Sequence, residues 1–229
     1  MKKELTFNKK SLVLTLLSDA DNSVFNEIFT EREYSLLDPI IQKATSGIID
    51  IGAHIGLFSI YARTLNQNVP IFAFEPEPEN YKLLKENLKQ NRVQGITAKS
   101  LAVSAKIGSI TLNISPDSHN HSIILPSPSE KILQVQSTTL ERTLSQYFQN
   151  QQRCDLIKMD CEGAEFEIIA TTPPETFAKI NAFYIEYHEY TPEMRKDSIK
   201  STLQKHGFKT QIHQSHYDRR MGFILAVRQ

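Results

Sequence analysis

The sequence predicts an α/β fold with a mainly parallel β-sheet of seven strands. Short apolar runs that end in an acidic residue recur along the chain, and segments with helical spacing follow them. The first complete unit begins with Ile48–Ile51, which is followed by Gly52 and Gly56 in a strand-to-helix turn. Near the C-terminus, Phe208–His213 and Gly222–Arg228 predict two strands that pair as an antiparallel hairpin.

The N-terminal part of the chain predicts one strand and two short helices. Leu12–Leu17 has the apolar composition of a strand, and Asp21 or Asn22 is suited to cap the helix that follows. A second helix is predicted over about Ser35–Ala44. Tyr34 lies between the two helices and is interpreted as a core residue, with cover of a cofactor as the alternative role.

The middle of the chain predicts the other parallel strands, with helices between them. Strands are predicted over Ile71–Glu75, Ile96–Val103, Asp155–Met159 and Asn181–His188. Helices are predicted from Pro78 onward, over Thr138–Phe148 and over Thr191–His206. Two further strands, Ser109–Ile114 and Lys131–Ser137, flank the Ser- and Pro-rich stretch Ser115–Glu130, which is expected to form a loop over the acceptor site.

An acid at the end of the second strand indicates a nucleotide-like ligand. Glu75 would lie beside the first turn, where its carboxylate can accept hydrogen bonds from ribose hydroxyls. Gly52 would let a ligand approach the backbone, and Gly56 would let the helix pack closely on the strand. The order D-x-G-x-x-x-G, with Asp50 before the glycines, differs from the dinucleotide pattern G-x-G-x-x-G. We therefore favour S-adenosylmethionine, whose ammonium group Asp50 could meet directly or through water.

Composition and charge are those of one sizeable domain with an N-terminal extension. The 229 residues are expected to divide into an extension at residues 1–45 and a main domain at residues 46–229. Lys plus Arg and Asp plus Glu balance at 26 each, so no overall positive charge attracts nucleic acid or anionic lipid. Cys154 and Cys161 form no disulfide or metal-binding pattern, and no long apolar stretch follows the basic N-terminus. We expect a cytoplasmic protein without nucleic-acid or membrane partners.

Several separate sequence blocks resemble the FkbM family of methyltransferases. In chain order these blocks are DIGAHIG at 50–56, FEPEPENY at 74–81, AVS at 102–104, TL at 139–140, KMDCEGAE at 158–165 and IEYH at 185–188. The resemblance implies a class I methyltransferase fold, which is Rossmann-like, with S-adenosylmethionine as cofactor. It also implies a small-molecule substrate, usually methylated on a hydroxyl oxygen of a sugar or a secondary metabolite.

The resemblance further implies which residues contact the cofactor. Its methionine end would lie against Asp50, Gly52, Ala53 and Gly56, its ribose against Glu75, its adenine against Pro76 and Ala102, and its methyl group near Asp160. His54 belongs to the same turn and is included in this set, although the family often has Asn at that position.

The ends of the fourth and fifth strands supply the candidate catalytic residues, which are Asp160, Glu162, Glu186 and His188. An alcohol must lose its proton to attack a methyl group, and an imidazole has an unperturbed pKa near neutrality. His188 is therefore predicted to be the base, with Glu186 or Asp160 as its orienting partner. The same four side chains could instead hold a divalent ion, but their spacing does not require one, and no metal site is assigned.

Two other functions remain open at this point. A nicotinamide-dependent oxidoreductase would also use the acid at Glu75, but it needs the glycine pattern that the first turn lacks. A binding module could keep the S-adenosylmethionine pocket without catalysis. A methyltransferase that acts on a small hydroxylated molecule is the preferred prediction.

Overall fold

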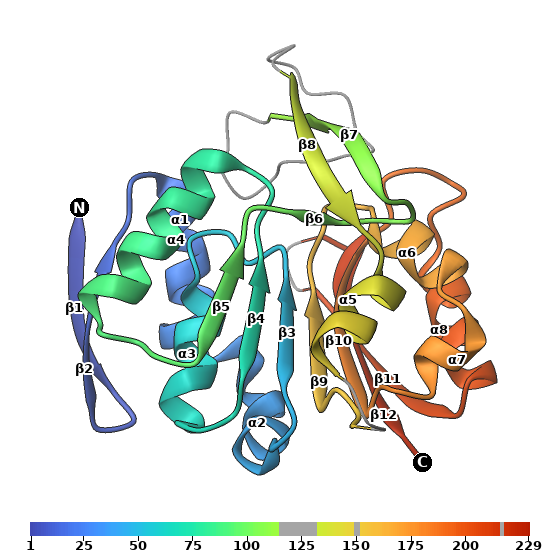
Figure 1. The fold of residues 1–229 in the computed structure, drawn as a ribbon, viewed down its shortest axis with the longest axis horizontal. Coiled ribbons are helices and arrows are strands. Elements are labelled where there is room, and N and C mark those ends of the chain that lie inside the picture. The colour runs from blue at the N-terminus through green and yellow to red at the C-terminus, as the bar shows by residue number, and fades with distance from the viewer. Residues whose placement is uncertain (115–131, 149–151, 216–217) are drawn as a thin grey trace.

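The computed structural model describes residues 1–114, 132–148, 152–215 and 218–229. The predicted loop Ser115–Glu130 lies outside these residues. At the centre of the fold is one twisted sheet of seven strands with helices on both faces (Figure 1). The strand order is β11 (Phe208–Gln214), β12 (Met221–Arg228), β10 (Ala182–His188), β9 (Leu156–Met159), β3 (Ile48–Ile51), β4 (Ile71–Phe74) and β5 (Ile96–Lys99).

The strand pairing confirms the predicted sheet. β5, β4, β3, β9 and β10 run parallel to one another, whereas β12 is antiparallel to both β10 and β11. The central strands β3, β4 and β9 are short, largely apolar and without an exposed residue. Such strands are covered on both faces, which is the usual state of parallel strands.

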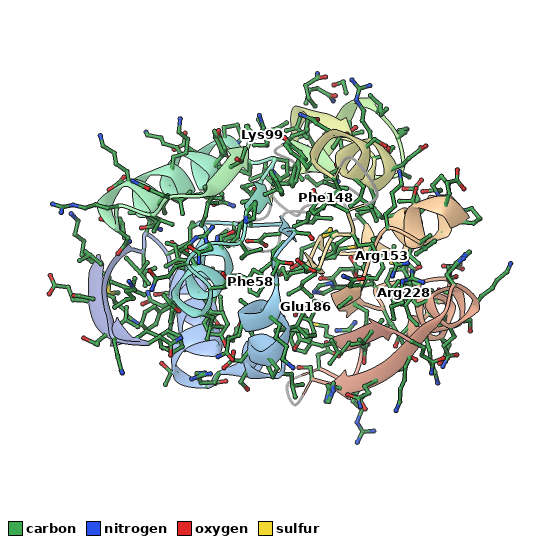
Figure 2. All side chains as sticks on the ribbon, turned by 60° about the horizontal axis from the view of Figure 1, so that its bottom comes forward. Phe58, Lys99, Phe148, Arg153, Glu186 and Arg228 are labelled. Carbon is green, nitrogen blue, oxygen red and sulfur yellow. The ribbon has the colours of Figure 1, made fainter. Side chains whose placement is uncertain are left out.

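Two helical layers cover the sheet. One layer holds α1 (Asp19–Phe25), α2 (Asp38–Lys43), α3 (Leu57–Leu65) and α4 (Pro78–Gln90), and the other holds α5 (Leu140–Tyr147), α6 (Glu165–Thr171), α7 (Pro174–Phe177) and α8 (Lys196–Lys205). Because successive strand residues point to opposite faces, Ile48 packs in the first layer while Ile49 and Ile51 pack in the second. Side chains fill both layers, and Phe58 and Phe148 lie on opposite sides of β3 and β4 (Figure 2).

The N-terminal segment differs from the sequence prediction in two places. The predicted strand is β2 (Lys10–Thr15), and it pairs with an unpredicted antiparallel partner, β1 (Lys2–Phe7), in a separate two-stranded sheet. Helix α1 is capped by Ser18 and not by Asp21 or Asn22. The Ser18 hydroxyl accepts the Asp21 N–H, while the Asp21 carboxylate accepts the Ser18 N–H, so a capping box forms one turn earlier than predicted.

Irregular helices follow α1. The chain continues into a π-helical turn, η1 (Asn26–Thr30), and then a 3₁₀ turn, η2 (Glu33–Leu37), before α2 begins. The second predicted helix is therefore two short helices. The extension at residues 1–45 shares one hydrophobic core with β3, α3 and α4, so its proposed boundary runs through a continuous core.

Two predicted elements after α4 are shorter than expected. The strand predicted over Ile96–Val103 divides into β5 and β6 (Ala102–Val103), and β6 joins a small sheet with β7 (Gly108–Asn113) and β8 (Ile132–Thr138). The last helix, α8, starts at Lys196 because the Glu189 carboxylate accepts the Lys196 N–H and fixes the start there. In the parts of the chain that the structure describes, no helix combines the length and apolar character needed to cross a membrane.

Candidate functional site

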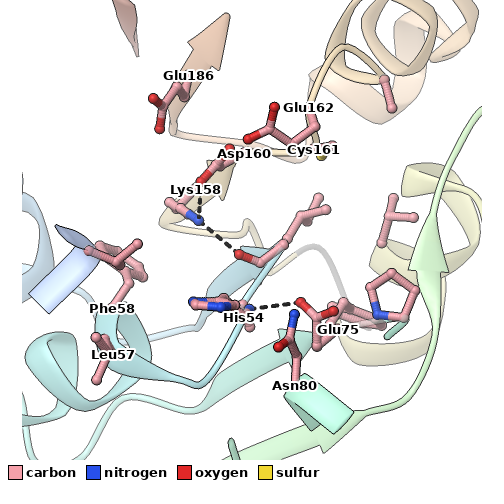
Figure 3. Close-up of a pocket in the computed structure, with 18 of the residues that line it drawn as sticks. His54, Leu57, Phe58, Glu75, Asn80, Lys158, Asp160, Cys161, Glu162 and Glu186 are labelled. Carbon is pink, nitrogen blue, oxygen red and sulfur yellow. Dashed lines mark hydrogen bonds and ion pairs between the residues drawn. The ribbon is translucent and has the colours of Figure 1, made fainter. Parts of the chain in front are cut away.

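A pocket opens at the carboxyl ends of the parallel strands, where the strand order reverses. β3 lies between β4, which follows it in sequence, and β9, which comes more than one hundred residues later. Ligands of open α/β sheets bind at such a switch point. The pocket contains about 1190 Å³ of empty space, part of it open to solvent. Glu75 lies toward one end, whereas Asp160, Glu162 and Glu186 lie toward the other (Figure 3).

Gly52 lines the pocket but is needed for a reason that the sequence did not predict. Its φ angle is +70°, and a Cβ atom built there would lie 1.8 Å from the carbonyl oxygen of Asp160. The expected role was to let a ligand approach, whereas the atom that occupies this space belongs to the chain. The absence of a side chain at Gly52 lets the ends of β3 and β9 touch.

Asp50 and Gly56 lie behind the pocket wall. The Asp50 side chain is completely buried, accepts a hydrogen bond from the Ser59 hydroxyl at 2.7 Å, and has one oxygen 3.7 Å from Lys158 Nζ. Gly56 adopts φ +86° at the start of α3, where a Cβ would lie 3.1 Å from Leu84 Cγ of α4. Both residues support the binding turn, and among the described lining residues neither is present.

Glu75 combines deep burial with partly used oxygens. Its Oε2 accepts the His54 N–H at 2.8 Å, and its Oε1 accepts the Glu77 N–H at 2.9 Å. A carboxylate has about four lone-pair sites, so capacity for two further donors remains. Burial raises the pKa of Glu75 to about 7, and His54 and the two backbone donors oppose this rise. The carboxylate can therefore gain from a ligand that donates two hydroxyl hydrogens.

His54 connects the binding turn to the N-terminal helix. It adopts φ +50° in the turn, and its N–H binds Glu75 (Figure 3). Its Nε2 lies 3.2 Å from Asp21 Oδ1 of α1. Burial raises the pKa of Asp21, but hydrogen bonds from His54 and from the backbone outweigh it and hold that pKa well below its usual range. The turn and α1 are thus held together at the edge of the pocket.

The wall beside Glu75 is mainly apolar. Its contributors include Ala53, Phe74, Pro76, Ala102 and Val103, all of which line the pocket. β6 carries Ala102 there because the third predicted strand breaks after β5 and crosses above the sheet. An apolar wall next to a hydrogen-bonding carboxylate suits an adenosine group.

The opposite end of the pocket concentrates negative charge. Asp160, Glu162 and Glu186 line it, and Lys158 Nζ lies 3.4 Å from Asp160 Oδ2 and donates to the carbonyl oxygen of Gly52 at 3.0 Å. Burial and neighbouring carboxylates raise the pKa of Glu186 well above its usual range, and burial raises that of Glu162 to about 7. The Glu162 carboxylate also accepts a short hydrogen bond from the Tyr190 hydroxyl.

His188 lies behind these acids. Its prediction as the base assumed an unperturbed imidazole pKa, and this assumption is wrong. Its side chain is 1% exposed, and it does not belong to the described pocket lining. Burial lowers its pKa, but Glu162 and Glu165 outweigh burial and raise that pKa well above the usual value. The imidazole is therefore held protonated rather than ready to accept a proton. His188 Nδ1 lies 3.1 Å from Glu165 Oε1, so the partner on this side is Glu165.

The pocket lining includes residues that were not predicted. Glu27 and Ile28 reach the pocket from η1, and Lys158 reaches it from β9. A lysine inside an apolar strand that ends in acids is a signal that could have been noticed, because a buried charge needs a partner. Glu27 carries no comparable signal, since only the packing of the N-terminal segment brings it near β9 and β10.

Comparison with known proteins identifies the family. The sequence model of the family described as the methyltransferase FkbM domain matches residues 50–210. The chain belongs to the FkbM methyltransferase family. The FkbM match spans the binding turn, both groups of pocket acids and all parallel strands of the sheet except the first two residues of β3.

Individual relatives agree with this assignment. Methyltransferase sdnD of Sordaria araneosa is 27% identical over 214 residues, 81% of each chain. The 31-O-demethyl-FK506 methyltransferase FkbM of Streptomyces tacrolimicus is 33% identical over 94 residues, which are 41% of this chain and 35% of that protein.

Solved structures share the fold. The methyltransferase FkbM of Methylobacillus flagellatus KT has a TM-score of 0.55 at 14% identity, over 80% of this chain and 43% of that one. The magnesium protoporphyrin IX methyltransferase of Synechocystis PCC 6803, solved with bound S-adenosylmethionine, has a TM-score of 0.54 at 10% identity, over 94% and 86% of the two chains. These likenesses confirm the class I methyltransferase fold.

FkbM membership sets the general activity. The protein is a methyltransferase that uses S-adenosylmethionine, and the pocket fits this cofactor because Glu75 has free acceptor capacity beside an apolar wall. The excess of carboxylates at the other end is also compatible with a positively charged sulfonium. The nicotinamide alternative is set aside, since this family and fold belong to methyltransferases.

Proposed function

We propose that this FkbM-family protein methylates a hydroxyl oxygen of a small molecule, a sugar or a secondary metabolite. The observation that carries the proposal is a carboxyl group at the acceptor end of the pocket, whose raised pKa makes its ionised form a stronger base than an ordinary carboxylate. Glu186 lines the pocket, its side chain is 21% exposed, and none of the described residues donates a hydrogen bond to it. An alcohol needs such a base, whereas a neutral amine or a thiolate does not. The FK506 relative is also named for an oxygen acceptor.

The pocket geometry suggests how the cofactor lies. Its ribose would donate to Glu75, its adenine would lie against the apolar wall near Pro76 and Ala102, and its sulfonium would face Asp160. When bound, the cofactor supplies an electrophilic methyl group. The chain orients that group toward the acids of β9 and β10, and Lys158 holds Asp160 in place. Asp50 acts through Lys158 and not by direct contact.

Glu186 replaces His188 as the proposed base. Glu186 would take the proton of the acceptor hydroxyl as the acceptor oxygen bonds to the methyl carbon. The bound cofactor would supply that methyl group and keep the electron pair of the broken carbon–sulfur bond on its sulfur, so S-adenosylhomocysteine would be the second product. A base in this position typically contributes ~10²–10⁴-fold to the rate. His188 is a positioning residue, since it lies within 3.9 Å of Glu186 but does not line the pocket.

A methyl-transfer assay with paired acceptors tests the proposal. The protein would be incubated with S-adenosylmethionine carrying a labelled methyl group and with hydroxylated acceptors, each beside its amino analogue and its O-methylated form. Label should enter only the free hydroxyl compounds, and Glu186→Gln should lower turnover by ~10²-fold or more with S-adenosylhomocysteine affinity retained.

Glu33→Gln is the matched control. It makes the same change to a carboxyl group, but Glu33 belongs to η2 and does not line the described pocket. This control should keep normal turnover. Transfer to amines in place of hydroxyls would refute O-methylation. Cofactor binding without transfer to any acceptor would favour the binding-module alternative, and normal turnover in Glu186→Gln would remove Glu186 as the base.

A further inference from the structure

One buried nitrogen next to the acidic end of the pocket makes no hydrogen bond. His188 Nε2 is completely buried, and among the described residues no atom lies in hydrogen-bonding geometry with it. Its nearest charged neighbours are Glu162 Oε1 at 3.7 Å and Glu186 Oε1 at 3.9 Å. Both distances are longer than the donor–acceptor distance of a hydrogen bond. A buried polar atom without a partner is costly, so its persistence calls for an explanation.

The other side of the same imidazole is fixed. Glu165 Oε1 accepts from the His188 backbone N–H at 2.9 Å and lies 3.1 Å from Nδ1. Glu165 Oε2 accepts the Gly163 N–H at 2.9 Å, and the whole residue is 0% exposed. Glu165 therefore cannot turn away, and it holds the ring with Nε2 toward the acids. A histidine that binds a metal through one ring nitrogen usually donates the N–H of its other ring nitrogen to a carboxylate. His188 and Glu165 have this arrangement.

Two acids complete a group around the free nitrogen. One ligand atom each from Asp160, Glu162 and His188 lie within 4.8 Å of one another. Two ligands bound at about 2.1 Å from an ion are about 3.0 Å apart at a right angle and about 4.2 Å apart when opposite. The Nε2–Oε1 distance of 3.7 Å falls within this range. Small side-chain rotations would bring a carboxylate oxygen of Asp160 within the same range of ligand–ligand distances.

The charge of the pocket favours a cation. Among the described lining residues there are five acids, Glu27, Glu75, Asp160, Glu162 and Glu186, against one lysine, Lys158. Three of these acids surround the His188 side of the pocket. The same carboxylates that favour a proton on Nε2 would favour a metal ion in its place.

We propose that Asp160, Glu162 and His188 form a binding site for one divalent cation of the Mn²⁺ type. Carboxylate oxygens suit Mg²⁺ and Mn²⁺, and a single imidazole shifts the preference toward the transition metal. The role of the ion rests on the proposed function. It would bind two neighbouring oxygens of the acceptor, as in a vicinal diol or a hydroxyl beside a carbonyl, and would lower the pKa of the hydroxyl that Glu186 deprotonates. The acceptor class is thus a small oxygen chelator.

Binding of Mn²⁺ can be measured without an acceptor. The full chain would be stripped with EDTA, dialysed, saturated with S-adenosylhomocysteine and titrated with Mn²⁺, and the free ion would be followed by its electron paramagnetic resonance signal. One Mn²⁺ per chain is expected. Glu162→Gln should weaken binding by more than about 100-fold, and Glu165→Gln, which changes only the outer partner of His188, by about 10–100-fold.

Glu27→Gln is the matched control, because it removes the same charge from the pocket outside the proposed group. It should weaken Mn²⁺ binding far less than Glu162→Gln does, because Glu27 acts on Asp160 only through its charge and offers no ligand atom to the proposed group. Each variant must still bind S-adenosylhomocysteine, which shows that it is folded. His188→Ala should weaken Mn²⁺ binding as strongly as Glu162→Gln does, and if His188→Ala does not fold, Glu162→Gln alone decides the outcome.

Two results would overturn the site: no Mn²⁺ bound by the unaltered chain, or equal weakening by Glu162→Gln and Glu27→Gln. The test of the metal site and the test of the proposed function can give different results. A chain that binds Mn²⁺ yet methylates no hydroxyl keeps the site and refutes the function. A chain that methylates hydroxyls but binds no Mn²⁺ in the titration keeps the function and refutes the site.

Discussion

Cofactor affinity should depend on pH through Glu75. Burial raises the pKa of this carboxyl to about 7, so the carboxylate is only partly ionised at neutral pH. Ribose hydroxyls need an ionised acceptor for the strongest hydrogen bonds. Above its pKa Glu75 is charged and ready to bind, whereas below that pKa its carboxyl group must first lose a proton. Affinity for S-adenosylhomocysteine should therefore fall as the pH is lowered through 7.

The size of the effect follows from the ionised fraction. With a pKa of about 7, Glu75 is about 90% ionised near pH 8 and about 10% ionised near pH 6. Affinity should change about tenfold between these conditions, which equals about 1.4 kcal/mol. Glu75→Gln cannot ionise, and it should bind more weakly near pH 8 by about 1.5–3 kcal/mol, the contribution of a hydrogen bond to a charged group.

Isothermal titration calorimetry with S-adenosylhomocysteine gives both quantities. Because binding should release a proton near pH 6, the measured enthalpy should differ between two buffers with different heats of ionisation. That buffer dependence should be absent in Glu75→Gln. Glu33→Gln is the matched control, because burial also raises the pKa of Glu33 to about 7 while its side chain lies outside the described pocket lining.

A flat affinity across this pH range would refute the reasoning about Glu75. So would a Glu75→Gln protein that keeps the full slope of the unaltered chain, since another pocket carboxylate would then be responsible. Loss of the slope in the Glu33→Gln control would show that the effect acts through folding and not through ligand contact.

Two further substitutions test the framework of the site. Gly52→Ala should lower the free energy of unfolding by more than the ~1–3 kcal/mol of backbone strain alone, because its Cβ would meet the Asp160 carbonyl. Gly108→Ala is its control, since φ is +130° there but no other heavy atom lies within 4 Å of a Cβ built at that position. Equal losses of unfolding free energy in urea for the two variants would contradict the collision. Asn87→Ala should cost about 1–3 kcal/mol for each buried group left unpaired, because this side chain bonds both backbone groups of Thr15; an unchanged melting temperature would exclude that role.

The sequence was sufficient to predict the sheet and the position of the pocket. Parallel strands buried on both faces give continuous apolar runs, and their carboxyl ends must meet at one edge. The acids Glu75, Asp160 and Glu186 follow or end such runs, so their arrangement around one pocket could be anticipated. β1 was missed because Lys2–Phe7 has no apolar run, and its partner strand decides its pairing.

Features that depend on packing between distant segments could not be predicted. The burial of His188 and its contact with Glu165 depend on how α6 lies over β10, and these contacts change its pKa. The break between β5 and β6 lies in a stretch that looks like one strand, and it becomes visible only when β8 supplies a partner. Glu27 enters the pocket through the docking of η1, for which no local pattern exists.

The contact between Gly52 and Asp160 joins the two halves of the pocket mechanically. The turn after β3 belongs to the cofactor side and the turn after β9 to the acceptor side, and Lys158 bridges them by binding the Gly52 carbonyl and the Asp160 carboxylate. The line along which the methyl group travels is therefore set when the sheet folds. Substitutions elsewhere in the pocket that leave Gly52, Lys158 and Asp160 unchanged should therefore preserve this line.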